Sequence, residues 1–331
     1  MKIIEVTNVD FSLRHFLLPL MRAMRGRGHE VIGACADGPL LAIPRAEGFR
    51  IVTPRLERTT SPLAHWRAFR DLVRLFRDER PDIVHAHMPI SGFLARMAAW
   101  WVGVPRIAYT CHGFWFNFPG SWPRAAIAIG NGRDPALFRP DPAARQRIRA
   151  DLNIPDERVV ILAVSRLVWH KGYPELAEAM RSLPSAALWV VGERLASDRG
   201  PDMAAVLGNA GLGDRLRMLG YREDIPALMA AADIFTLPSR FEGLPMSIIE
   251  AMLTGLPVVA ANVRGPAEQV EPEATGLLVP PGDAPGLAAA LGRLASDPSL
   301  RAVMGNAGRA RALERYDEAM VIFRTLDLME L

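Results

Sequence analysis

The sequence predicts an α/β protein made of two doubly wound parallel sheets, each a Rossmann-like domain. Short runs rich in Val, Ile and Ala alternate with segments of helical periodicity, which is the pattern of parallel strands joined by crossover helices. A length of 331 residues suggests two domains rather than one. Ligands of such sheets bind beyond the carboxyl ends of the strands, so we expect a site in a cleft between the two sheets.

The expected strands follow one another at regular spacing. In the first half they lie near residues 2–7, 30–35, 50–53, 82–86 and 105–110, and in the second half near 158–164, 187–191, 215–218, 233–236, 257–260 and 276–279. The Pro-rich stretch from Arg139 to Pro155 carries a short helix and is interpreted as the join. A helical run from about Ala284 to Leu331 closes the chain. We expect a first domain over residues 1–140, a second over 141–310, and a terminal helix over 311–331 that crosses back to the first domain.

Composition limits the protein class. Half of the residues are hydrophobic, which provides for a sizeable core. The start of the chain has no apolar run of signal-peptide length, and no run of about eighteen apolar residues occurs anywhere. We therefore expect a cytoplasmic protein. The two cysteines, Cys35 and Cys111, are too few for a disulfide scaffold and lack metal-ligand spacing, so they are expected to be reduced thiols.

The positive charge is concentrated in the first half. Residues 1–140 hold 19 Lys and Arg against 11 Asp and Glu, whereas the remainder holds 20 against 25. Five of the seven Trp also lie in the first half. Residues 61–77 alternate apolar and Arg positions at helical spacing, which fits a helix in peripheral contact with an anionic membrane, or an ordinary packing helix with a solvated basic face. No nucleic-acid motif accompanies the charge, so nucleic acid is not an expected partner.

Residues 241–259 place two carboxylates, Glu242 and Glu250, around the start of a helix. Pro245 suits the first helical position because it has no N–H to leave unsatisfied. The free N–H groups of a helix start form a site for phosphate. Carboxylates accept hydrogen bonds from sugar and ribose hydroxyls, so the segment suits a sugar diphosphate. Taken alone, either glutamate fits a solvated surface residue better than a ligand-binding one.

This segment resembles the Glu-x(7)-Glu motif of the family 4 retaining glycosyltransferases, which have the GT-B fold. Neighbouring motifs of that family match in the same order: Ser165-Arg166-Leu167, Lys171-Gly172, Val191-Gly192-Glu193, Gly220 to Ile225, Ala232 to Ser239 and Thr275 to Val279. The resemblance covers residues 155–300 densely and residues 1–120 more loosely. His112-Gly113-Phe114 is similar to the branch that builds bacterial capsular, lipopolysaccharide O-antigen or exopolysaccharide chains.

The resemblance implies transfer of a sugar from a nucleotide-diphosphate sugar, with UDP the expected nucleotide, to a glycan or lipid-linked acceptor at the inner face of the membrane. Arg166 and Lys171 would bind the diphosphate, because fixed cations stabilise the charge that grows on the leaving group. The implied catalytic residues are His112, Glu242, Arg166 and Lys171, and the implied donor-binding residues are Arg166, Lys171, Gly192, Tyr221, Arg222, Glu242, Gly243, Leu244 and Glu250. In this set Gly243 and Leu244 offer backbone N–H groups, Glu242 holds the transferred sugar, Glu250 holds the ribose, and His112 contacts the donor sugar or the reacting centre.

We expect no cofactor and no metal, the nucleotide sugar being a substrate. No Asp-x-Asp pair stands in a suitable loop, and Asp224 is a plausible helix cap. His85 and His87 alternate on one strand and share a side like a metal pair, but no third ligand is evident, so a packing role is expected.

The first domain departs from the family pattern in two places. No Gly-x-Gly-x-x-Gly follows the first strand, so a dinucleotide has no obvious cradle there. Between the His-Gly-Phe segment and the residues from Ala125 to Asp134, the family would have about fifty more residues. We therefore expect a domain shortened after residue 124, with an exposed sheet edge or altered helix packing. A nucleotide-sugar-binding or scaffold protein with impaired catalysis is the alternative function, and a sugar-nucleotide epimerase is a weaker third.

Overall fold

The computed structural model describes residues 1–56, 61–110, 131–194 and 198–331, which form two compact units. Unit 1 comprises Met1–Ile127 with Ile322–Leu331, and unit 2 comprises Ala128–Val321. The division at Ile127 comes before the boundary expected at residue 140. The last residues of the chain belong to unit 1, and their side chains Leu326 and Met329 are buried in its core.

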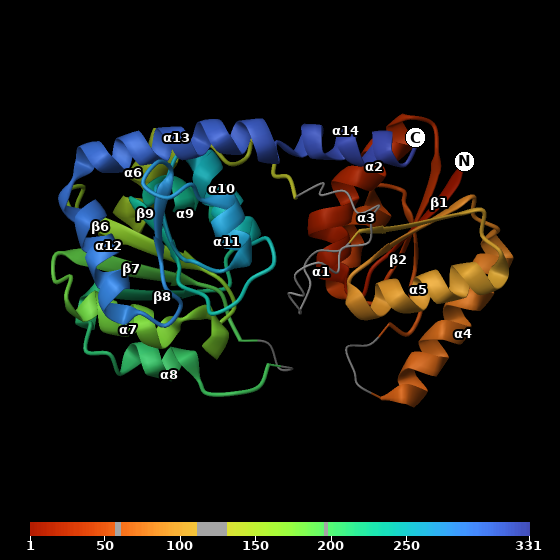
Figure 1. The fold of residues 1–331 in the computed structure, drawn as a ribbon, viewed down its shortest axis with the longest axis horizontal. Helices are drawn as coiled ribbons and strands as arrows, with labels where there is room; N and C mark the ends of the chain where they lie inside the picture. The colour runs from red at the N-terminus through yellow and green to blue at the C-terminus, as the bar shows by residue number, and fades with distance from the viewer. Residues whose placement is uncertain (57–60, 111–130, 195–197) are drawn as a thin grey trace. The chain divides into compact units, whose positions relative to one another are not determined.

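Unit 1 is a parallel five-stranded sheet with helices on both faces (Figure 1). The strand order is β3-β2-β1-β4-β5, from β1 (Lys2–Val6), β2 (Glu30–Ala34), β3 (Arg50–Val52), β4 (Ile83–His87) and β5 (Arg106–Thr110). Its longer helices are α2 (Leu18–Gly26), α4 (Pro62–Glu79) and α5 (Pro89–Val102), together with α14 (Glu318–Leu328) from Ile322 onward, and its shorter ones are α1 (Asp10–Ser12) and α3 (Ala42–Ala46). Among the described residues β5 is an edge strand.

Neighbouring residues of one strand point to opposite faces of this sheet, because side chains alternate along a strand. Ile4 packs with the residues of α4 and α5, whereas Ile3 packs with those of α2 and α14. Cys35, which follows β2, is a buried free thiol, and burial raises its pKa to about 12. It is therefore an ordinary thiol.

Unit 2 is a parallel six-stranded sheet in the order β11-β10-β9-β6-β7-β8. The strands are β6 (Val159–Val164), β7 (Ala186–Val191), β8 (Leu216–Gly220), β9 (Ile234–Leu237), β10 (Val258–Ala261) and β11 (Gly276–Val279). One face carries α6 (Pro142–Asp151), α9 (Ile225–Ala231), α10 (Met246–Thr254) and α13 (Pro298–Tyr316), and the other carries α7 (Tyr173–Arg181), α8 (Met203–Gly208) and α12 (Ala284–Ser296). A short helix, α11 (Arg264–Gln269), follows β10. The winding reverses between β6 and β9, so loops leaving these two strands lie side by side.

The predicted fold is confirmed: every expected strand is present, displaced by at most one or two residues at its ends. The helix expected over residues 61–77 is α4, and Ser61 caps its start by accepting a hydrogen bond from Ala64 N. No helix in the described part of the chain is long and apolar enough to cross a bilayer.

Two details of the prediction were wrong. Pro245 is not the first residue of α10; it precedes the helix in an extended conformation, with φ −67° and ψ 122°. Asp224 does stand at the N-cap of α9, but its side chain makes no capping bond. Both of its carboxylate oxygens accept hydrogen bonds from Arg222 instead, at 2.7 and 2.6 Å. The expected shortening after residue 124 lies outside the described residues.

Candidate functional site

The loops that leave β6 and β9 are bound to each other at the point where the winding of unit 2 reverses. Arg240 N donates a hydrogen bond to His170 O at 2.8 Å. Gly172 has φ +76°, and a Cβ there would lie 2.1 Å from Pro238 O, so only glycine fits this approach. The loop that follows β7 approaches the loop that follows β6 just as closely, because a Cβ on Gly192 would lie 2.1 Å from Ser165 O.

This contact brings Lys171 and Glu242 together. Lys171 Nζ lies 2.5 Å from Glu242 Oε1, and Ser239 Oγ donates to the same oxygen at 2.7 Å. The side chains are largely buried, with 15% of Lys171 and 10% of Glu242 exposed. A cation and a carboxylate thus lie together beyond the ends of β6 and β9.

His170 lies next to this pair and stacks on Phe241, with ring centroids 4.5 Å apart. Its pKa is lowered, first by burial and then by the positive charges of Lys171 and Arg166. The imidazole is therefore neutral near pH 7. His170 therefore lies beside the Lys171–Glu242 pair without adding a charge to it.

The start of α10 offers unsatisfied hydrogen-bond donors. Pro245 provides no side-chain cap, and among the described residues no hydrogen bond is donated by the backbone N–H of Gly243 or Leu244. The loop is fixed from behind, because a Cβ on Gly265 would lie 1.6 Å from Gly243 O. Free N–H groups at a helix start attract anions.

Glu250 lies on α10 and is 8% exposed. Its Oε1 accepts a hydrogen bond from Arg133 Nε at 2.6 Å, and 13% and 11% of the two side chains are exposed. No local sequence pattern indicates this contact, because Arg133 stands 117 positions earlier in a short loop. The expected ribose ligand is thus already paired with a cation that we had not predicted.

The remaining expected donor residues are spread along the strand ends. Arg166 follows β6 and forms an ion pair with Asp198. No sequence pattern pointed to Asp198. Arg222 is bound to Asp224. Tyr221 is 55% exposed, and its backbone N–H donates to Glu193 Oε1 at 3.1 Å. The structure therefore does not join Arg166, Tyr221 or Arg222 directly to Lys171. His112 lies outside the described residues.

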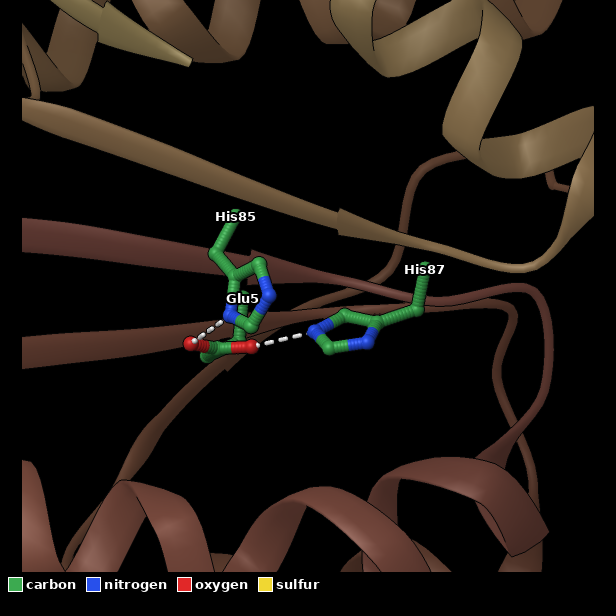
Figure 2. Close-up of side chains that lie close together, drawn as sticks. All are labelled: Glu5, His85 and His87. Atoms are coloured by element: carbon green, nitrogen blue, oxygen red, sulfur yellow. Dashed lines mark hydrogen bonds and ion pairs between the residues drawn. The ribbon is translucent and has the colours of Figure 1, made fainter. Parts of the chain in front are cut away.

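Unit 1 contains a buried polar cluster of Glu5, His85 and His87 at its own point of reversal, between β1 and β4 (Figure 2). Figure 2 shows the Glu5 carboxylate bonded to both rings: Oε1 lies 2.9 Å from His85 Nδ1 and Oε2 lies 2.7 Å from His87 Nε2. His85 Nε2 also lies 2.8 Å from Thr110 Oγ1. Our expectation that no third ligand stands near the two histidines was wrong, because Glu5 is paired with His85 across neighbouring strands.

The potential ligand atoms of this cluster lie within 4.8 Å of one another, as a metal site would need. Each carboxylate oxygen already has an imidazole partner, so the cluster satisfies its own hydrogen bonds. Burial would raise the pKa of Glu5, but the two imidazoles outweigh it and lower this pKa to about 2. The carboxylate is thus ionised and held as part of the polar core.

Comparison with known families decides the identity. The family described as "Glycosyl transferases group 1" matches residues 144–311, and "Glycosyltransferase Family 4" matches residues 15–163. The chain belongs to the group 1 glycosyltransferases. This glycosyltransferase is accordingly a retaining enzyme of the GT-B fold that transfers a sugar from a nucleotide sugar.

The similar proteins include two lipopolysaccharide core biosynthesis glycosyltransferases of Rhizobium meliloti, LpsE and LpsD. An Escherichia coli enzyme, UDP-Gal:alpha-D-GlcNAc-diphosphoundecaprenol alpha-1,3-galactosyltransferase, is 28% identical over 298 residues, which cover 76% of each chain. EpsD of Bacillus subtilis is 26% identical and covers 99% of this glycosyltransferase and 96% of its own length. The structure of Anabaena Alr3699/HepE in complex with UDP and glucose has the same fold, with a TM-score of 0.86 at 22% identity over 100% and 99% of the two chains.

The alignment with EpsD also bears on chain length. It runs over 372 positions, although this glycosyltransferase has only 331 residues. The relative therefore has residues without a counterpart here.

The Glu5 cluster generates a prediction about stability. The lowered pKa means that the stabilisation is present above pH 4.5, the ordinary value, and is lost as the pH falls toward 2. Glu5→Gln should lower the free energy of unfolding at pH 7 by roughly 3 kcal/mol. This loss should shrink when denaturant unfolding is repeated at pH 3. Glu178→Gln, at an exposed position, is the control and should change little; a Glu5→Gln loss of equal size at both pH values would contradict the account.

Proposed function

We propose that unit 2 binds a nucleotide-diphosphate sugar, with UDP as the nucleotide, and that the protein transfers the sugar to a glycan or lipid-linked acceptor in bacterial surface polysaccharide synthesis. The observation that carries the proposal is the Lys171–Glu242 pair beside the uncapped start of α10. It combines a cation and free N–H groups for phosphate with a carboxylate for hydroxyls.

In the proposed complex, Lys171 turns from Glu242 to the diphosphate. The N–H groups of Gly243 and Leu244 and the positive end of the α10 dipole bind the same phosphates. Arg166, 43% of whose side chain is exposed, can exchange Asp198 for a phosphate oxygen at little cost, because exposed ion pairs are weak. These groups supply positive charge, so the reaction as proposed needs no metal ion.

Glu242 is assigned to the transferred sugar. When Lys171 moves to phosphate, the carboxylate keeps the Ser239 hydroxyl and gains sugar hydroxyls as donors. Lys171 keeps an anionic partner throughout, because a phosphate oxygen takes the place of the Glu242 carboxylate. Glu250 is assigned to the ribose hydroxyls, one turn into α10.

The proposed transfer breaks the bond between the anomeric carbon and the diphosphate oxygen, and the bonding electrons leave with the diphosphate. The acceptor hydroxyl oxygen bonds to the same face of the anomeric carbon, and its proton passes to the departing phosphate. Lys171 and Arg166 stabilise the charge that grows on that phosphate. His112 is proposed to contact the sugar at the reacting centre.

The relatives support the choice of UDP and of the acceptor class. The name of the Escherichia coli enzyme gives UDP-Gal as donor and a diphosphoundecaprenol-linked sugar as acceptor. The Anabaena structure holds UDP and glucose. A Rhizobium meliloti relative, 32% identical over about half of each chain, is a lipopolysaccharide core biosynthesis glycosyltransferase.

A second candidate is a protein that binds nucleotide sugars but transfers them poorly. The residues that EpsD has in excess of this chain favour it. Binding of UDP without turnover of any UDP-sugar would distinguish this candidate from the active enzyme.

Removal of Lys171 tests the donor site. With the preferred donor, identified by a hydrolysis screen over UDP-, GDP- and ADP-sugars, Lys171→Ala should lower turnover about a hundredfold or more, because a cation that acts on the leaving group is lost. Glu250→Ala should lose activity in the same assay. Both variants should lose far less stability in thermal unfolding than activity. Arg293→Ala, in an exposed pair with Glu273, is the control; wild-type turnover in Lys171→Ala would sink the assignment.

We further propose that α4 and α5 of unit 1 touch an anionic membrane. Large apolar side chains on one face of α5 are exposed by 41–68%: Ile90, Phe93, Met97, Trp100 and Trp101. On α4, which lies beside α5 in Figure 1, the exposed positions include Arg67, Arg70, Arg74 and Arg77. An apolar stripe with Trp next to a row of Arg suits the interface of a bilayer that carries negative lipids.

Vesicle binding tests this surface. A Trp100→Ser/Trp101→Ser variant should partition at least about tenfold more weakly into phosphatidylglycerol vesicles, because two large apolar side chains no longer enter the interface. Wild type should bind uncharged phosphatidylcholine vesicles more weakly and should lose binding in high salt. Val303→Ser removes a similarly exposed apolar side chain of α13 and should behave as wild type. Unchanged co-sedimentation of the double variant would refute the proposed contact.

A further inference from the structure

We propose that Arg133 is a positioning residue for ribose recognition, which holds the Glu250 carboxylate in the orientation that ribose hydroxyls require. The proposal rests on the donor site proposed above. It adds a residue from outside the helix and strand ends that form the rest of that site.

The ion pair itself is the first observation. Arg133 Nε donates to Glu250 Oε1 at 2.6 Å, and both side chains are close to nine-tenths buried. A carboxylate this buried is costly without a partner. Among the described residues none donates a hydrogen bond to the second oxygen, Oε2, which leaves it for a ligand.

The backbone of Arg133 is fixed at the junction of α13 and α14. Its N–H donates to Tyr316 O at 2.9 Å, and its carbonyl accepts from Glu318 N at 3.1 Å. The preceding residue, Gly132, allows this contact, because a Cβ there would lie 2.6 Å from Glu318 Cα. The backbone that carries the Arg133 guanidinium is therefore held in place.

Glu250 is held by contacts with α13, the helix that also holds the backbone of Arg133. Its helix, α10, packs on α13 through Ile248 and Met252, which share a core cluster with Ala312 and Tyr316 of α13. A Cβ on Gly305 of α13 would lie 2.1 Å from Gly255 O, just past the end of α10, so the two helices are in close contact. Both ends of the ion pair are thus attached to one helix.

This arrangement lets the ion pair survive ligand binding. Oε1 stays with Arg133 while Oε2 accepts a ribose hydroxyl, so the carboxylate need not reorganise. Without Arg133, the Glu250 carboxylate would turn toward solvent. Its advantage for a ribose over a deoxyribose would then fall.

Calorimetric titration with UDP and GDP, and with their 2′-deoxy analogues, tests the proposal in the full-length protein. Arg133→Met should weaken binding of the preferred ribonucleotide by about tenfold, the size expected for a hydrogen bond to a charged group. It should affect the deoxy analogue much less, so the ratio of the two affinities falls. Arg133→Lys should restore part of that ratio. In a Glu250→Gln background, Arg133→Met should have little further effect.

The outcomes separate the two proposals. If the wild type binds neither UDP nor GDP, the donor site fails and this inference with it. If the wild type prefers the ribonucleotide and loses the preference in Glu250→Gln, but Arg133→Met and Arg133→Lys both keep it, only the role of Arg133 is overturned. Tighter ribonucleotide binding by Arg133→Met would also overturn it, because Arg133 would then compete with the ribose. Arg293→Met, at the exposed pair with Glu273, is the matched control.

Discussion

Parallel pairing of β6 with β9 is the constraint on which the site of unit 2 depends. The two strands are far apart in sequence, yet Leu162 lies opposite Phe235 in the sheet. The chain leaves both strands at the same edge, so the loop that ends at Gly172 meets the loop that begins at Pro238. The contact between them tolerates no side chain at Gly172. Lys171 and Glu242 are neighbours only because of this backbone contact.

A second regularity concerns charge. The expected ligand groups of unit 2 have partners within the protein: Lys171 with Glu242, Arg133 with Glu250, Arg166 with Asp198, and Arg222 with Asp224. A site with buried charges but no ligand would otherwise be costly. The least exposed pairs contain the two glutamates, whereas Arg166 is more open to solvent. We infer that binding of a donor exchanges partners at Lys171 and Arg166 and leaves the Arg133–Glu250 pair in place.

The sequence predicted the strands well because buried parallel strands carry short, continuous apolar runs. The family resemblance also implied that Lys171, Glu242 and the start of α10 serve one site, and Lys171 and Glu242 do lie together, beyond the ends of the neighbouring strands β6 and β9. The sequence did not predict the long-range partners. Glu5 and Arg133 reach their partners across sheet neighbours or through a fixed loop, and no local pattern encodes such a contact. Pro245 was misplaced by one residue because proline fits both the residue before a helix and its first turn.

The central claim is that Lys171, the start of α10 and Glu250 hold one nucleotide-diphosphate sugar. A crystal structure of the protein with UDP tests it most directly. The account predicts diphosphate oxygens within hydrogen-bond distance of Lys171 Nζ and the N–H groups of Gly243 and Leu244, with a ribose hydroxyl on Glu250 Oε2. Nucleotide bound elsewhere, with the Lys171–Glu242 pair intact, would contradict it.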